Sequence, residues 1–320
     1  MLTSSADTVA RQRPAYRSFR AVVARALRLT PHFTRITFTG EEFAGFGTAG
    51  LDQRVKVVLP LAGRGYADFP DGEDWYQQWR ELPADRRNPF RTYTVRAVRP
   101  AEREVDIDFA LHGDIGPAST WAARAMAGEE IVLIGPDELS PDRAVGIDFR
   151  PGAVETVLLA GDETAAPAIC AILEQLPATA AGVAIIEVPT TADELSVRAP
   201  AGVEVRWLAR TADDAVHGER LVPAVRDWVA RNCAPAADSA GATVDDLALA
   251  LEAAERADRD DAPLWDVPEG RSLDGDCYAW IAGEASVITG LRRFLVRDAG
   301  LDRRRVAFMG YWRRGRAEVE

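Results

Sequence analysis

The hydrophobic pattern of this 320-residue chain changes near residue 150, and this change limits the fold more than any other feature. Before that point, short runs of alternating apolar residues are separated by glycine and proline. Beyond it, nearly continuous apolar runs alternate with segments of helical spacing. Alternation is typical of antiparallel strands with one solvated face, whereas continuous runs are typical of parallel strands buried on both faces. We therefore predict two domains, residues 16–150 and residues 151–320.

The first domain is predicted to be an antiparallel six-stranded β-barrel. Its strand-like runs cover residues 18–27, 33–38, 55–59, 92–98, 104–111 and 130–134. Several short strands with turn residues between them are typical of small barrels. Trp75, Trp79 and Leu82 have the i, i+4, i+7 spacing of an amphipathic helix, and residues 117–127 predict another helix.

The second domain is predicted to be an α/β domain with a parallel sheet. Its strand-like runs at residues 154–160, 183–188, 203–208, 277–282 and 306–311 alternate with helical segments at 166–176, 221–230 and 285–299. This alternation predicts crossover helices between parallel strands. Residues 234–276 interrupt it with twelve acidic residues and three arginines. We interpret them as an acidic insertion containing one helix, more typical of a solvated connection than of a lid.

Composition argues against several classes of protein. The net charge of −12 disfavours nucleic-acid binding, no apolar run reaches the ~20 residues of a membrane-spanning helix, and the N-terminus lacks the apolar core of a signal peptide. Cys170, Cys233 and Cys277 are far apart in sequence and predict buried free thiols, and the scattered histidines predict no protein-ligated metal. We therefore expect a cytoplasmic monomer.

Residues 91–96 (RTYTVR) carry the groups that a flavin requires. An aromatic ring can lie against the isoalloxazine face, a hydroxyl can hydrogen-bond near N5, and a guanidinium can pair with the diphosphate. Tyr93, Thr94 and Arg91 match these roles, and the period of two along a strand puts Tyr93 and Arg91 on one face. The alternative interpretation is a half-buried tyrosine beside a surface arginine.

Residues 112–119 (HGDIGPAS) follow a predicted strand and open a predicted helix. Gly116 permits a close approach of the backbone to a ligand, Pro117 suits the first helical position, and Ser119 adds a hydroxyl. Free N–H groups at a helix start suit a phosphate, although an ordinary helix start has the same features. The two segments together, in this order, favour a flavin diphosphate site.

Candidate nucleotide contacts follow the strands of the second domain. The first strand is followed by three polar residues, Asp162, Glu163 and Thr164. Open α/β sheets bind ligands at this edge, but Thr164 is equally suited to cap the next helix. Gly283 and Glu284 follow a later strand and would border the nicotinamide and the flavin. Arg210, past the third strand, is a candidate 2′-phosphate contact or, alternatively, a surface arginine.

Five segments of the chain resemble the siderophore-interacting proteins, which are relatives of the ferredoxin-reductase flavoenzymes. They are residues 91–96, 112–122 (HGDIGPASTWA), 160–169 (AGDETAAPAI), 280–284 (WIAGE) and 310–315 (GYWRRG). The resemblance extends from about residue 20 to residue 316. It implies an N-terminal FAD-binding barrel, a C-terminal NAD(P)H-binding α/β domain, and cytoplasmic reduction of ferric siderophores with NADPH or NADH as donor. Whether a ferredoxin can replace that donor stays open.

The resemblance also assigns roles to residues of the matching motifs. On the flavin-binding strand it places Arg91, Tyr93, Thr94 and Arg96. On the diphosphate and adenosine side it places His112, Gly116, Ala118 and Ser119. In the first nucleotide loop it places Gly161, Asp162, Glu163 and Thr164. The acidic segment 234–276 departs from the family pattern because it is longer than the pattern requires.

Basic residues near the C-terminus provide candidate contacts for an anionic iron chelate. Residues 292–316 contain nine arginines and only two acids, although each arginine taken alone is as readily a solvated charge. The candidate contacts are Lys56, Arg292, Arg293, Arg313 and Arg314. Two alternatives to a ferric-siderophore reductase stay open: an NAD(P)H–flavin oxidoreductase that serves a protein partner or free flavin, and a siderophore-binding protein without turnover.

Overall fold

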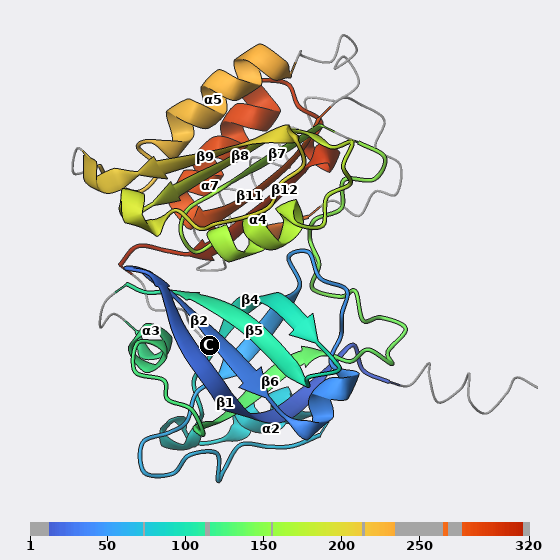
Figure 1. The fold of residues 1–320 in the computed structure, drawn as a ribbon, viewed down its shortest axis with the longest axis vertical. Helices are drawn as coiled ribbons and strands as arrows, with labels where there is room; N and C mark the ends of the chain where they lie inside the picture. The colour runs from blue at the N-terminus through green and yellow to red at the C-terminus, as the bar shows by residue number, and fades with distance from the viewer. Residues whose placement is uncertain are drawn as a thin grey trace, which may run out of the picture. The chain divides into compact units, whose positions relative to one another are not determined.

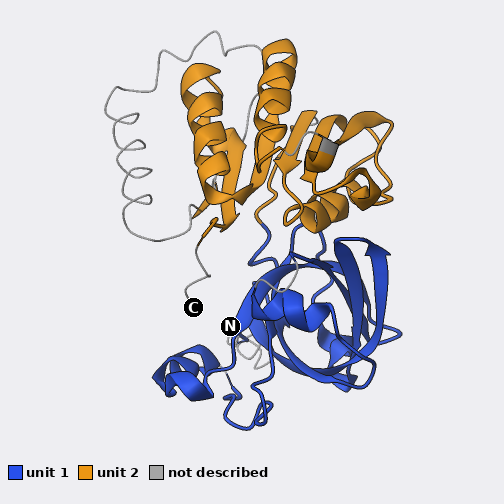
Figure 2. Ribbon diagram, turned by 90° about the vertical axis from the view of Figure 1, so that its left-hand side faces the viewer, with its two compact units in different colours: residues 1–147, 320 blue, residues 148–319 orange. Residues whose placement is uncertain are grey.

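The computed structural model describes residues 13–72, 74–112, 116–154, 156–212, 215–233, 265–267 and 277–315 (Figure 1). The chain forms two compact units, unit 1 over residues 1–147 and unit 2 over residues 148–319 (Figure 2). Each unit has a hydrophobic core of its own.

Unit 1 is a closed antiparallel barrel of six strands within its described residues, which confirms the prediction (Figure 1). The strands are β1 (Tyr16–Thr30), β2 (Phe33–Thr39), β3 (Arg54–Val58), β4 (Phe90–Arg99), β5 (Glu104–Ala110) and β6 (Glu130–Pro136). They follow each other around the barrel in the order β1-β2-β5-β4-β3-β6, and β6 pairs with β1 to close it. Closure pairs the sheet edges that would otherwise be exposed.

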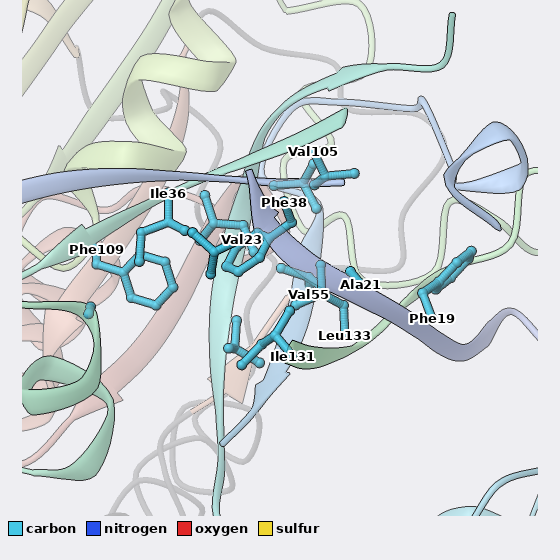
Figure 3. Close-up of a cluster of buried hydrophobic side chains, with 14 of the residues drawn as sticks. Phe19, Ala21, Val23, Ile36, Phe38, Val55, Val105, Phe109, Ile131 and Leu133 are labelled. Carbon is cyan, nitrogen blue, oxygen red and sulfur yellow. The ribbon is translucent and has the colours of Figure 1, made fainter. Parts of the chain in front are cut away.

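Alternate residues of the barrel strands fill its interior (Figure 3). Phe19, Ala21 and Val23 of β1 point inward, and Ile36 and Phe38 of β2 do the same. The inward period of two is the pattern from which the barrel was predicted. The interior is therefore a packed core of aromatic and aliphatic side chains.

Short helical segments connect the strands of the barrel, and Phe43, Ala118 and Ala122 from two of them join its hydrophobic core. These segments are η1 (Glu41–Gly45), α2 (Trp75–Glu81), η2 (Ala84–Arg86) and α3 (Pro117–Ala122). Trp75 and Trp79 are buried in a second cluster with Phe69 and Phe90, which confirms the amphipathic helix. The indole of Trp79 donates to the carbonyl of Asn88 at 2.9 Å. Helix α3 is shorter than the predicted helix 117–127 because residues after Ala122 form turns.

Unit 2 contains a sheet with the order β10-β12-β11-β7-β8-β9 across the part that the structure describes (Figure 1). The strands are β7 (Thr156–Gly161), β8 (Ala181–Val188), β9 (Gly202–Ala209), β10 (Trp265–Asp266), β11 (Tyr278–Glu284) and β12 (Val306–Trp312). All pairings are parallel except that of β10 with β12. The predicted parallel sheet is thus confirmed, with an antiparallel edge strand that was not predicted.

Strand β10 lies within the segment interpreted as an acidic insertion. Its two residues pair with Met309 and Phe308 of β12, so part of that segment belongs to the sheet. The interpretation of the whole segment as a connection was therefore wrong at this point. The helix predicted there, near residues 244–251, lies outside the described residues.

Helices cover both faces of the sheet in unit 2 (Figure 1). Helix α4 (Ala166–Leu173) lies on one face, and α5 (Leu221–Asn232) and α7 (Ala285–Arg293) lie on the other. The predicted helix 285–299 changes after Arg293 into a π-helical turn, Phe294–Asp298. Short 3₁₀ segments, η3 (Thr191–Asp193), η4 (Arg210–Ala212) and η7 (Arg303–Arg305), complete the described elements.

The strand order contains a reversal that positions a candidate site. From β7 the chain continues to β8 and β9 on one side, and then returns to place β11 on the other side of β7. Parallel α/β sheets bind ligands at the carboxyl ends of the strands where the order reverses. In this sheet that point is marked by Gly161 at the end of β7 and Glu284 at the end of β11.

Candidate functional site

The predicted flavin strand, β4, presents an aromatic ring and a guanidinium on one face. Tyr93 pairs with Val55 and Arg91 with Val57, and both valines belong to the barrel core. The ring of Tyr93 packs against Phe109 with 4.4 Å between centroids. Strand β4 pairs with β3 from its first residues, whereas its ladder with β5 begins only at Val95. Tyr93 therefore lies where β4 and β5 diverge.

Arg96 occupies a β-bulge in β4. Val95 pairs with Ile107 and the next paired residue, Ala97, pairs with Asp106, so Arg96 is the extra residue. A bulge re-aims the side chain that it contains. The guanidinium of Arg96 lies 3.6 Å from the buried carboxylate of Asp108.

Asp108 receives a second arginine, which the sequence did not indicate. Arg35 donates two hydrogen bonds to its carboxylate, at 2.7 and 2.8 Å. The partners are 73 residues apart, so no local pattern connects them. Arg96 and Arg35 share the Asp108 carboxylate, which holds Arg96 against the barrel. A contact between Arg96 and a flavin stays a prediction.

The start of α3 borders an open cavity of about 460 Å³. The cavity is lined by Gly116, Pro117, Thr120, Trp121, Arg124 and Glu129. Two other predicted residues, Ala118 and Ser119, are buried. The backbone N–H of His112 donates to the hydroxyl of Ser119 at 3.0 Å, which ties the end of β5 to α3. The structure thus brings together the residues predicted for the diphosphate side.

Gly116 fits a close approach by a ligand. Its φ is 88°, and a Cβ atom built there meets no atom within 4 Å. A β-branched side chain would cost roughly 1–2 kcal/mol in this backbone conformation and would project into open space. The space beside Gly116 is therefore available to a bound group.

Gly116→Val is expected to weaken FAD binding at least about tenfold, because the side chain would occupy space beside the cavity. Gly128→Val is the matched control: Gly128 has φ 91° and equally open surroundings, but it does not line the cavity. Titration of each purified variant with FAD, followed by flavin fluorescence, measures the two affinities. Equal losses in both variants would assign the effect to backbone strain.

A buried carboxylate, Asp162, connects three strand ends at the reversal point of unit 2. One oxygen accepts hydrogen bonds from the N–H and the hydroxyl of Thr164. The other accepts the N–H of Glu284 at 2.8 Å and the indole N–H of Trp312 at 2.9 Å. Asp162 is only 3% exposed. The residues predicted at the ends of β7 and β11 therefore meet directly.

Gly283 is required by this junction. Its φ is 147°, and a Cβ atom there would lie 2.7 Å from a carboxylate oxygen of Asp162. Thr164 does not cap the next helix, because Ala165 is the N-cap of α4 and no side chain caps it. Of the two roles considered for Thr164, capping is therefore wrong, and its hydroxyl instead donates to Asp162.

Glu163 and Arg210 form a buried ion pair beside this junction. The guanidinium of Arg210 donates to both oxygens of Glu163 at 2.7 Å and lies 3.4 Å from Glu187. Arg210 is only 8% exposed, so the surface-arginine alternative was wrong. Both terminal nitrogens of Arg210 already donate to Glu163, and its contact with a 2′-phosphate stays a prediction.

Two further residues of this network were missed at the sequence level. Nε2 of His217 lies 3.1 Å from Glu163, and its ring packs edge-on against Trp312 with 4.8 Å between centroids. Burial opposes ionisation of Glu163, but the hydrogen bonds from His217 and Arg210 outweigh it and lower the pKa of Glu163 to about 2. Glu163 is therefore ionised at neutral pH.

Glu187 and Glu284 stabilise the starts of two helices. Glu187 is fully buried and accepts the backbone N–H groups of Gly218, Arg220 and Leu221 at the start of α5. Glu284 accepts those of Ser286 and Val287 at the start of α7. Carboxylates at these positions satisfy backbone donors and complement the helix dipole. Glu284 thus acts as a helix cap as well as a candidate nucleotide contact.

The pH dependence of stability is expected to report on Asp162. Burial and the charge of Glu163 raise its pKa from the usual 3.8 to about 6. The folded state therefore binds the proton more tightly than the unfolded state, and this contribution is complete below pH 3.8 and is lost as the pH rises through 6. The free energy of unfolding of the wild type, relative to Asp162→Asn, should fall by about 2.5 kcal/mol between pH 4 and 7.

Urea unfolding of both proteins at each pH measures this difference. The hydrogen bonds lost in Asp162→Asn change the free energy of unfolding by the same amount at every pH. They therefore do not contribute to its pH dependence. Glu163 adds none either, because its pKa of about 2 leaves it charged over this range. If the difference in the free energy of unfolding between the two proteins did not change with pH, Asp162 would titrate as an ordinary carboxyl group.

Three of the predicted basic residues lie along β12 of unit 2. Arg292 pairs with Asp266 at 2.7 Å and stacks over Phe308 near the start of β12, with only 11% of its side chain exposed. Arg313 and Arg314 follow the end of β12, and the N–H of Arg314 donates to Glu284. Arg292 and the Arg313–Arg314 pair therefore lie toward opposite ends of β12, and the contact of any of them with a chelate stays a prediction.

The other two predicted basic residues lie on α7 and on β3 of unit 1. Arg293 is exposed in the last turn of α7. Lys56 lies on β3 of unit 1, where its ammonium lies over the ring of Phe90 and 3.3 Å from the hydroxyl of Thr92. Within unit 2, Arg313 and Arg314 are the predicted basic residues adjacent to the Asp162 junction.

Among the described residues, no group of three or more histidine, cysteine, aspartate or glutamate side chains is arranged to hold a metal ion. No helix among them has the length and apolar character needed to cross a membrane.

Relatives with assigned names are similar over much of the chain. The ferric vibriobactin reductase ViuB of Vibrio cholerae is 29% identical over 290 residues, covering 91% of this chain and 87% of ViuB. The NADPH-dependent ferric-chelate reductase of Escherichia coli is 30% identical over 207 residues, covering 63% of this chain and 76% of the relative. The crystal structure of the siderophore-interacting protein SipS from Aeromonas hydrophila is 28% identical, covers 95% of both chains and has a TM-score of 0.65.

Two family models match consecutive parts of the chain. Residues 22–139 match the siderophore-interacting FAD-binding domain, which corresponds to the barrel. Residues 154–315 match the siderophore-interacting protein model, which corresponds to the α/β unit. The resemblance inferred from five short motifs is thereby confirmed over most of the sequence. This chain belongs to the siderophore-interacting protein family.

Proposed function

We propose that this protein is an FAD-dependent ferric-siderophore reductase, which uses NADPH or NADH and releases Fe(II) in the cytoplasm. The observation that carries the proposal is the Asp162 junction, which lies where the strand order of the sheet in unit 2 reverses. This sheet follows the closed six-stranded barrel in the chain. The names of the ViuB and E. coli relatives, both ferric reductases, support the reaction class.

The residues of unit 1 fit FAD. Tyr93 and Thr94 would contact the isoalloxazine, Arg91 would pair with the diphosphate, and the cavity at Gly116 would accept the phosphate or adenosine side. When bound, FAD supplies exchange between a two-electron hydride donor and a one-electron ferric acceptor. The protein contributes orientation and electrostatics, so no acid–base pair of side chains is required.

The residues of unit 2 fit a nicotinamide nucleotide. The carboxylates of Asp162 and Glu284 accept hydrogen bonds from the protein itself, so they position the strand ends. Gly283 lets the backbone pass close to the Asp162 carboxylate, because a Cβ atom there would lie 2.7 Å from it. We infer that the nicotinamide lies over Gly283, bordered by Glu284. This edge would hold the ring in place while the hydride leaves it.

Arg313 and Arg314 are the proposed contacts for the anionic chelate. The double variant Arg313→Glu/Arg314→Glu is expected to raise the KM for a ferric chelate several-fold with little change in kcat, because uniform binding is lost. Arg293→Glu is the control, since Arg293 is exposed at the end of α7. Steady-state reduction with a ferrous trap measures both. Equal KM values for the two variants would remove Arg313 and Arg314 from the chelate site.

The visible spectrum of the purified protein tests the proposal directly. A flavin band should be present or appear with FAD, should bleach anaerobically with NADPH or NADH, and should return on addition of ferric chelate while a ferrous trap reports Fe(II). Bleaching without Fe(II) would indicate another acceptor, such as free flavin or a protein. Failure to take up FAD at all would overturn the proposal and leave a binding protein without turnover.

A further inference from the structure

A half-buried indole, that of Trp121 in α3, lines the open cavity of unit 1. Its ring lies nearly parallel to the ring of Phe38 in β2, with 6.2 Å between centroids and 9° between planes. It also meets the ring of Phe109 in β5, at 5.9 Å and 62°. Phe38 and Phe109 are fully buried in the barrel core (Figure 3). The core therefore fixes the orientation of an indole that is still partly exposed at the cavity.

A second half-buried ring lies beside Phe109. Tyr93 of β4 contacts Phe109 with 4.4 Å between centroids, so Tyr93 and Trp121 pack against the same buried ring. Unit 1 thus presents two partly exposed aromatic rings, one on the predicted flavin strand and one at the cavity. FAD also contains two flat aromatic ring systems, the isoalloxazine and the adenine, which a diphosphate links. The two protein rings therefore match the two ends of FAD.

The polar groups around Trp121 distinguish adenine from isoalloxazine. The carboxylate of Glu129 lines the same cavity. It can accept a hydrogen bond from the amino group of adenine, whereas it would repel the carbonyl oxygens of an isoalloxazine. The hydroxyl of Thr120 donates to the carbonyl of Gly116 at 3.0 Å, and its oxygen can accept a further hydrogen bond. Both groups at the cavity thus suit a base that carries a donor.

We propose, on the basis of the function proposed above, that Trp121 is the adenine-binding residue of the FAD site and makes unit 1 select FAD over FMN. Adenine would lie against the indole, as flat rings do when they stack. Because Phe38 and Phe109 already hold the indole, little conformational freedom is lost on binding. FMN has the isoalloxazine and one phosphate but lacks the adenosine. The contact at Trp121 therefore adds to the affinity for FAD alone.

The ratio of the two flavin affinities tests the role of Trp121. Full-length protein from which any flavin has been removed is titrated with FAD and with FMN, and flavin fluorescence gives each Kd. The wild type should bind FAD more tightly than FMN. Trp121→Ala should raise the Kd for FAD roughly 5- to 100-fold and leave the Kd for FMN within about twofold. Trp121→Phe keeps an aromatic face and should retain most of the preference for FAD.

Tyr66→Ala is the matched control. Tyr66 is also half-buried and packs against the same core, but it does not line this cavity, so its loss should leave the ratio unchanged. If Trp121→Ala does not fold, Trp121→Leu keeps apolar packing without an aromatic face and should show the same loss of FAD affinity.

Three results would overturn the adenine contact. They are an equal loss of FAD and FMN affinity in the Trp121 variants, no loss of either, and a wild type that binds the two flavins equally well. A wild type that binds neither flavin would instead contradict the proposed function itself.

Discussion

Replacing Arg210 by alanine is expected to destabilise the protein by about 3–5 kcal/mol, because two buried carboxylates would lose the guanidinium charge that they share. Arg210 makes two 2.7 Å hydrogen bonds to Glu163 and lies 3.4 Å from Glu187. Both glutamates are at most 1% exposed. Removing one member of a buried pair leaves an uncompensated charge, which costs far more than the pair contributes when intact.

Urea unfolding at pH 7 measures this change, and Arg206→Ala is its matched control. Arg206 lies on β9, four residues before Arg210, and pairs with Glu204 at the surface, so its loss should cost at most about 1 kcal/mol. The experiment also decides between two roles for Arg210. If Arg210→Ala keeps full stability and instead raises the KM for NADPH but not for NADH, then the 2′-phosphate contact is correct and the structural role is not.

Arg91→Ala is expected to weaken FAD binding by roughly 10- to 100-fold. A guanidinium that pairs with a diphosphate contributes charge-assisted hydrogen bonds of about 1.5–3 kcal/mol, and each 1.4 kcal/mol is a factor of ten in Kd. The fold should be little affected, because the side chain is only partly buried and its hydrogen bond to the carbonyl of Phe90 is local. FAD titration followed by fluorescence measures the affinity.

Thr92→Ala is the control for this measurement. Thr92 is exposed on the same strand and, by the period of two, points to the face opposite that of Arg91. Its replacement should leave FAD affinity within about twofold. If Arg91→Ala binds FAD as tightly as Thr92→Ala, the diphosphate must be held elsewhere, and the α3 start at Gly116 becomes the sole candidate among the residues predicted here.

The layout of the fold was predictable because burial imposes a period on the sequence. The barrel strands alternate, so Phe19, Ala21 and Val23 already indicate one inward face. The central strands of unit 2 are buried on both faces and appear as continuous apolar runs. Strand β10 has two residues and therefore no period to detect. Element ends were missed by a few residues because polar residues continue a strand beyond its apolar run.

The site was predictable only where a local motif carries it. Asp162 and Glu284 were found because each directly follows a buried strand. His217 was not found, because its partner Glu163 is 54 residues away and nothing near either residue indicates the contact. Trp312 is separated from Asp162 by 150 residues. Arg210 was misjudged for the same reason, since a buried ion pair and a surface arginine look alike in one sequence.

The hydrogen bonds of Asp162 have a mechanical consequence for unit 2. A single side chain holds the loop after β7, the end of β11 and the end of β12, so none of the three can shift while the others stay in place. If a nucleotide binds here as proposed, the three strand ends would not move to fit nucleotides of different shape. Only the segments around the junction could change their conformation. A substitution of Trp312, near the end of the described chain, should therefore also affect the loop at Thr164, far earlier in the sequence.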